Sequence, residues 1–199
     1  MEKIAGLLFF LAGIVILMGI LTAEIFYGTT YSVSLNMISN LGSTPPPHSI
    51  VREPSAFIFD KSLLIAGILI MVGIYFIQKV SKNMFFTVSL AILGLGTFGV
   101  GIFPAFHAVI HPLVALIAFL GGGLASVSSA RVTKSPFSFM AILLGITSLS
   151  FLGLGVLAPH VIVPIFGAGG TERWVMYPVL LWLTGFGGYL MNAAAPRSS

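Results

Sequence analysis

The sequence predicts an all-α polytopic membrane protein in which six transmembrane helices form one bundle. Only 7% of its 199 residues are charged and 57% are hydrophobic, and the mean hydropathy is +1.09. A soluble domain carries roughly a quarter charged residues, so this chain has too few charges to solvate a globular surface in water. Six nearly uncharged runs are each long enough to cross a hydrocarbon core of about 30 Å. Lipid is therefore the expected solvent for most of the surface.

The boundaries of the six spans follow from charges, prolines and helix caps. The first run is longer than the apolar region of a signal peptide, about 7–15 residues, and no Ala-x-Ala cleavage site follows it. Pro54 suits the first position of the second helix, and Thr171 suits the N-cap of the sixth. We expect a single domain, 1–192, a polar tail, 193–199, and spans at about 4–23, 54–78, 84–103, 113–130, 137–158 and 172–191.

The distribution of basic residues predicts the orientation in the membrane. Six spans place both termini on one side, and a long loop between the first two helices lies on the other. Six basic residues share the side of the termini and three lie opposite: Lys3, Lys79, Lys82, Arg131, Lys134 and Arg197 against Arg52, Lys61 and Arg173. An excess of Lys and Arg marks the cytoplasmic face. We therefore predict a cell-membrane protein with cytoplasmic termini and a lipid environment, and the net charge of +4 does not indicate a nucleic-acid partner.

This topology gathers the titratable side chains at the outer end of the bundle. All four histidines and four of the five acidic residues fall on that side. Ionisable groups near the membrane interior are costly and usually face a cavity or a partner. A functional site is therefore expected at the extracytoplasmic end. The chain contains no cysteine, which excludes thiolate metal ligands and cysteine nucleophiles.

Three of the histidines are candidate metal ligands. His107 and His111 are four residues apart, which would place both on one helix face and suit two ligands of one metal ion. Pro112 opposes a continuous helix through them, so we expect His111 to cap the fourth helix and His107 to lie in the turn. His160 would have to converge with His111, and together they would clamp a haem iron or join Asp60 around a metal ion. A metal ion, haem b and no cofactor all remain open, and hydrogen bonding to loop carbonyls is the structural alternative.

The remaining candidates are acidic, basic and amide side chains of the outer loops. Two carboxylates would act as general acid or base over a lipid headgroup, and the basic residues would hold an anion such as phosphate. The alternative is a set of interfacial ion pairs with favourable helix-end electrostatics. The candidate catalytic residues are Asp60 and Glu172, and the candidate ligand-binding residues are Ser39, Asn40, Arg52 and Arg173.

Several segments in order resemble a known family. They read Ile-Ser-Asn-Leu-Gly at 38–42, Pro-Ser-Ala-Phe-Ile-Phe-Asp at 54–60, Gly-Ile-Phe-Pro at 101–104 and Gly-Thr-Glu-Arg-Trp at 170–174. Together they resemble the prokaryotic membrane family catalogued as domain of unknown function number 998, over nearly the whole chain. The resemblance implies a six-helix integral membrane protein and assigns no biochemical role. A fainter likeness, to seven-helix metal-dependent membrane hydrolases, rests on Ser39, Asp60, His107 and His111.

Three classes of function are compatible with these patterns. The first is a protein that binds a lipid or small ligand at the outer end of the bundle, with hydrolysis or metal assistance as further possibilities. The second is an electron-transfer protein that uses the outer histidines to hold haem b or a metal ion. The third is a non-catalytic membrane partner or assembly protein. The first class is the one we expect, while the ligand, the oligomeric state and any catalytic activity are not specified by the sequence.

Overall fold

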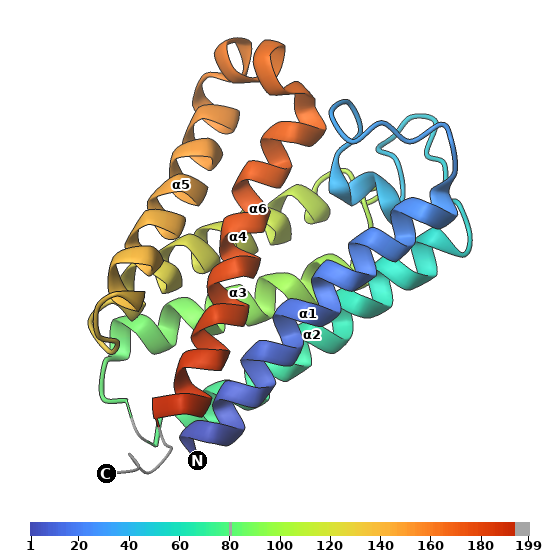
Figure 1. Cartoon of the computed structure of the whole chain (residues 1–199). Coiled ribbons are helices and arrows are strands. Elements are labelled where there is room, and N and C mark those ends of the chain that lie inside the picture. Colours follow the sequence, from blue (N-terminus) through green and yellow to red (C-terminus); the bar gives the residue numbers. More distant parts are fainter. Residues whose placement is uncertain (80, 194–199) are drawn as a thin grey trace.

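The computed structural model describes residues 1–79 and 81–193, and within them it consists of helices without strands (Figure 1). Six helices are long and apolar enough to cross a membrane. They are α1 (Glu2–Tyr27), α2 (Ser55–Ile77), α3 (Met84–Ile102), α4 (Ile110–Ser129), α5 (Phe137–Leu157) and α6 (Pro159–Ala193), and a short 3-10 helix, η1 (Ile38–Leu41), lies in the loop between α1 and α2. The predicted six-helix all-α bundle is confirmed. Of the predicted tail, residues 194–199 lie outside the described residues.

The helices form a closed ring in chain order. Each packs against the next, α1 returns to pack against α6, and α4 also touches α6. Figure 1 shows the N-terminus and the end of α6 at one end of the bundle and the α1–α2 loop at the other. The aromatic rings of Phe9, Phe86, Trp182 and Phe186 are fully buried in the core. They pack with centroid separations of 5.3–5.8 Å, so α1, α3 and α6 are joined near the end that carries the termini.

The loop after α1 folds back against the bundle at η1. All four residues of this 3-10 helix, Ile38–Leu41, are buried, and η1 contacts α1, α2 and α6. The side-chain oxygen of Asn40 accepts a hydrogen bond from the backbone N–H of Met37 at 2.8 Å, which closes the turn from within. The longest loop is therefore packed against the end of the bundle opposite the termini.

Helices α4 and α6 begin earlier than the sequence predicts. The segment 159–171, expected to be a loop, is helical from Pro159, and the helix is interrupted only at Gly167, whose φ of 74° is in the left-handed region. The Thr171 hydroxyl donates to the Gly167 carbonyl at 2.8 Å, so Thr171 lies inside the helix. Helix α4 includes Pro112 in its first turn, where a missing N–H costs no intrahelical bond.

Candidate ligand-binding site

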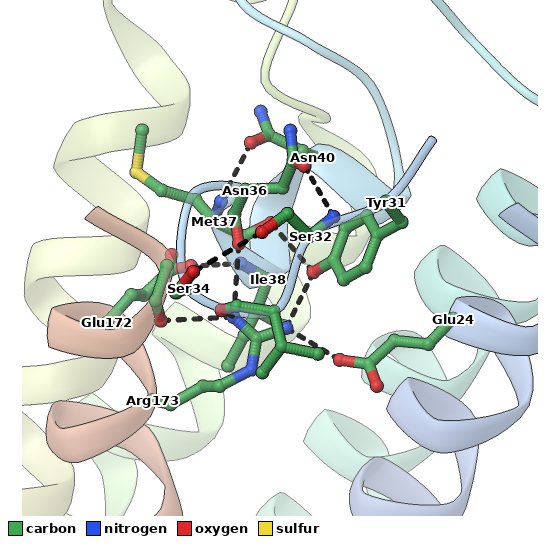
Figure 2. Close-up of polar contacts among 12 residues, drawn as sticks. Glu24, Tyr31, Ser32, Ser34, Asn36, Met37, Ile38, Asn40, Glu172 and Arg173 are labelled. Carbon is green, nitrogen blue, oxygen red and sulfur yellow. Dashed lines mark hydrogen bonds and ion pairs between the residues drawn. The ribbon is translucent and has the colours of Figure 1, made fainter. Parts of the chain in front are cut away.

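Arg173 joins α6 to the outer loop and to α1. Its side chain is only 7% exposed, and its guanidinium extends from α6 toward the loop (Figure 2). Nη2 donates to Glu24 Oε1 at 2.6 Å and to the Tyr31 hydroxyl at 2.7 Å. Nη1 donates to three backbone carbonyl oxygens, those of Val33 at 2.7 Å, Asn36 at 3.0 Å and Gly169 at 3.0 Å. Both terminal nitrogens are thus occupied by acceptors of the protein itself.

Tyr31 completes this cluster as a neutral phenol. Burial raises the pKa of Tyr31 to about 12, so its hydroxyl keeps its hydrogen at physiological pH. That hydrogen is donated to the Met37 carbonyl at 3.1 Å while the oxygen accepts from Arg173. Tyr31 therefore links the guanidinium to the start of η1.

Glu172 contacts the same loop from the other side of α6. Its Oε2 accepts hydrogen bonds from the backbone N–H groups of Ile38 and Ser39, the second at 3.4 Å. Successive residues on a helix point about 100° apart, so Glu172 and Arg173 bind different parts of the loop. Arg173 supplies donors to loop carbonyls, and Glu172 supplies an acceptor to loop N–H groups (Figure 2). The pair fixes the loop on α6.

A groove with mostly apolar walls reaches Glu172 from the α5 side. It has a volume of about 320 Å³ and lies between α4, α5 and α6, with Met37 of the loop at its edge. A smaller cavity of about 40 Å³ lies inside the bundle, and its polar lining residues are Ser39, Thr97, His111 and Glu172. Ala115, Phe119 and Glu172 line both spaces. Glu172 therefore stands at the boundary between the groove and the inner cavity.

The three histidines predicted as metal ligands occupy different environments. His111 is buried in the first turn of α4, and its Nδ1 lies 2.7 Å from the Phe103 carbonyl oxygen. Because a carbonyl only accepts, Nδ1 carries the hydrogen of this bond. The His107 ring packs on Phe106 with centroids 4.3 Å apart, and His160 is exposed at the start of α6. Within the described residues, no three His, Asp or Glu side chains lie close enough together to hold one metal ion. The three histidines predicted as metal ligands are therefore not assembled into one site there.

The other candidates divide between the site and its surroundings. Ser39 lines the inner cavity, and Asn40 holds the turn. The Asp60 carboxylate lies on α2 beside Gly42, and its buried Oδ1 has no hydrogen-bond partner in the described part of the chain. The guanidinium of Arg52 is exposed, 5.1 Å from the centre of the Tyr27 ring. The structure thus brings Ser39, His111 and Glu172 to one cavity, and Arg173 follows Glu172 on α6. Arg52 and Asp60 take no part in the Arg173 cluster, and their predicted roles stay predictions.

Sequence reasoning missed Glu24, Tyr31 and the groove. Glu24 carries a usable signal, since an ionisable residue at the end of a transmembrane run requires a partner. Tyr31 and the groove have no comparable signal, because an apolar groove wall and a lipid-facing helix surface have the same composition.

Six apolar helices of spanning length, closed into one bundle, define a multi-pass membrane protein. Residues 10–189 match the family described as Protein of unknown function (DUF998). The chain belongs to this family, which confirms the resemblance noted in the sequence. No curated protein and no solved structure matches the chain.

Proposed function

We propose that the protein binds a membrane amphiphile, with the apolar chain of the ligand in the groove between α4, α5 and α6. The observation that carries the proposal is the groove itself, whose lining side chains are apolar apart from Thr171 and Glu172. Its volume of about 320 Å³ falls within the range of small-molecule sites, about 300–1,000 Å³. The polar end and the apolar walls match the two parts of an amphiphile.

The energetics of such a site differ from those of a soluble lipid carrier. An apolar chain gains little by leaving the bilayer, since lipid tails are as apolar as the groove walls. Binding then depends on close packing of the chain and on contacts of the headgroup. Thr171 and Glu172 are the polar side chains that line the groove, and Ser39 lines the adjoining inner cavity. General acid–base catalysis by Glu172 and Asp60 is not needed for this proposal, and Asp60 does not line the groove.

Filling the groove tests the proposal. Gly155 lines the groove, and a Cβ at this position would meet only the Thr171 Cγ2, at 3.3 Å, so a side chain can start there without contact to backbone atoms. We expect Gly155→Leu to lower the fraction of protein that co-purifies with a bound amphiphile about tenfold, which equals about 1.4 kcal/mol of binding free energy. Native mass spectrometry of protein released from mild detergent measures this fraction.

Gly153→Leu is the matched control. Gly153 lies on the same helix, does not line the groove, and a Cβ there would have no neighbour within 4 Å. We expect this variant to keep its bound amphiphile. Equal losses in the two variants, or wild-type protein without any bound amphiphile, would contradict the proposal.

We also propose that the groove end of the bundle is extracytoplasmic and that both termini are cytoplasmic. The six-to-three distribution of basic residues supports this orientation. The absence of cysteine allows a clean test with single substitutions in two exposed loops, Ser49→Cys and Ser135→Cys. A membrane-impermeant maleimide applied to intact cells should label Ser49→Cys at least about tenfold more than Ser135→Cys, because a charged reagent does not cross the hydrocarbon core. The reverse pattern would invert the topology.

A further inference from the structure

We propose that the groove selects amphiphiles whose headgroup carries a protonated amine, and that the Glu172 carboxylate recognises this ammonium group. The inference rests on the proposed function, because it assigns the headgroup of the same ligand. It begins with the charges at the outer end of α6. Arg173 forms its ion pair with Glu24 at 2.6 Å. Glu172 forms no ion pair within the described residues.

The donors of the cations near Glu172 are mostly committed elsewhere, and the buried Nε of Arg173 has no hydrogen-bond partner within the described residues. The two terminal nitrogens of Arg173 bind Glu24, Tyr31 and three backbone carbonyls. His111 lines the inner cavity with Glu172, but its Nδ1 is held by the Phe103 carbonyl. The formal charges of Glu24, Arg173 and Glu172 sum to minus one. A cationic headgroup would neutralise this cluster, whereas a phosphate or a carboxylate would add to its negative charge.

The hydrogen-bonding capacity of Glu172 supports the same class of ligand. An ionised carboxylate accepts about four hydrogen bonds, and two neutral backbone donors, Ile38 and Ser39, use part of this capacity on Oε2. An ammonium group supplies three donors and a full positive charge at a single point. A hydroxyl headgroup supplies one donor and no charge, so its hydrogen bond to the carboxylate lacks the attraction between opposite charges that an ammonium group adds. An amine is therefore favoured over an alcohol of the same chain length.

Binding of three single-chain probes tests the inference directly. Dodecylamine, dodecanol and dodecanoate share one chain, and at pH 7 the amine is protonated because its pKa is near that of lysine, about 10.4. Apparent dissociation constants are measured by native mass spectrometry of the full chain in mild detergent. We expect dodecylamine to bind at least about tenfold more tightly than dodecanol, and dodecanoate to bind most weakly.

Two variants assign the preference to Glu172. Glu172→Gln keeps a side-chain oxygen that can accept from Ile38 and Ser39, but it removes the charge. We expect it to bring the amine and alcohol affinities to within about twofold of each other, since the attraction between the ammonium group and a charged carboxylate is lost. Glu53→Gln is the control. Glu53 is an exposed acid of the loop between α1 and α2, and it does not line the groove. Like Glu172, it accepts a hydrogen bond from a backbone N–H group, that of Phe57 at 3.1 Å. This control should retain the wild-type preference. Thermal unfolding of both variants verifies that they are folded.

Each outcome separates the inference from the function on which it rests. Equal affinities for the amine and the alcohol in the wild-type protein would overturn the headgroup assignment and leave the groove as an amphiphile site. A preference that survives in folded Glu172→Gln protein would overturn the role of Glu172. Failure of all three probes to bind would overturn the proposed function itself.

In a parallel arm, binding of phosphatidylethanolamine in preference to phosphatidylglycerol supports a phospholipid as the source of the ammonium group. Binding of the single-chain amine alone supports a free long-chain amine.

Discussion

Replacement of Arg173 by methionine is expected to lower the free energy of unfolding by about 3–5 kcal/mol, the usual cost of removing one partner of a buried ion pair. Methionine preserves much of the aliphatic packing but removes five hydrogen bonds that reach Glu24, Tyr31 and three carbonyls. Glu24, whose side chain is 18% exposed, would then hold its charge without a partner. Chemical unfolding in detergent measures the loss, and proteolysis of the loop between α1 and α2 should accelerate at the same time.

Arg52→Met is the matched control for this experiment. Arg52 belongs to the same outer end, but its guanidinium is exposed and only stacks over the Tyr27 ring at 5.1 Å. Exposed cation–π contacts contribute about 0.5–1 kcal/mol, so Arg52→Met should cost no more than that. In addition, Glu24→Gln combined with Arg173→Met should cost less than the sum of the two single changes, because the residues share one interaction. If Arg52→Met and Arg173→Met lowered the free energy of unfolding equally, the hydrogen bonds of Arg173 would not contribute the expected stability.

The transmembrane spans could be predicted because their cause is local. A helix surrounded by lipid needs about twenty residues with few charges, and this requirement is visible in composition alone. The start of α6 could not be predicted in the same way. Its two prolines and its glycines indicated a loop, yet Gly167 adopts a φ of 74° that interrupts the helix at one residue and lets it resume. A glycine in such a sequence permits a loop and an interrupted helix equally.

The candidate site was predictable in its location and unpredictable in its contacts. Charge asymmetry predicted that the titratable residues gather at one end of the bundle, where the structure has Glu172 and Arg173 on neighbouring faces of α6, both bound to the loop between α1 and α2. The partner of Arg173, however, is Glu24, which is 149 residues away in the chain. Its other acceptors include backbone carbonyls, which every residue possesses and which leave no trace in the sequence. Tertiary packing alone determines which of them approach the guanidinium.

The approach of the loop to α6 depends on Gly169, and Gly169→Ala is expected to lower the free energy of unfolding by about 1–3 kcal/mol. A Cβ at this position would overlap the Asn36 carbonyl oxygen and lie 2.7 Å from the Val33 carbonyl oxygen. These are two of the acceptors that Arg173 Nη1 uses, so an alanine that displaces the loop would weaken those hydrogen bonds as well. Thermal and chemical unfolding in detergent measure the change.

Gly170→Ala is the control that distinguishes the steric effect at Gly169 from the effect of alanine on helix propensity. A Cβ on Gly170 would meet the Phe166 Cβ at 3.3 Å. The backbone N–H of residue 170 donates to the Ser34 carbonyl at 3.1 Å, and an alanine keeps this N–H group. Because alanine favours the helix over glycine by about 1 kcal/mol, Gly170→Ala should be neutral or stabilising. Opposite signs at two adjacent glycines would show that the loop is held by close backbone approach to α6. If the two substitutions had the same effect, the loop would tolerate a side chain at Gly169, and Arg173 would hold it without help from this close contact.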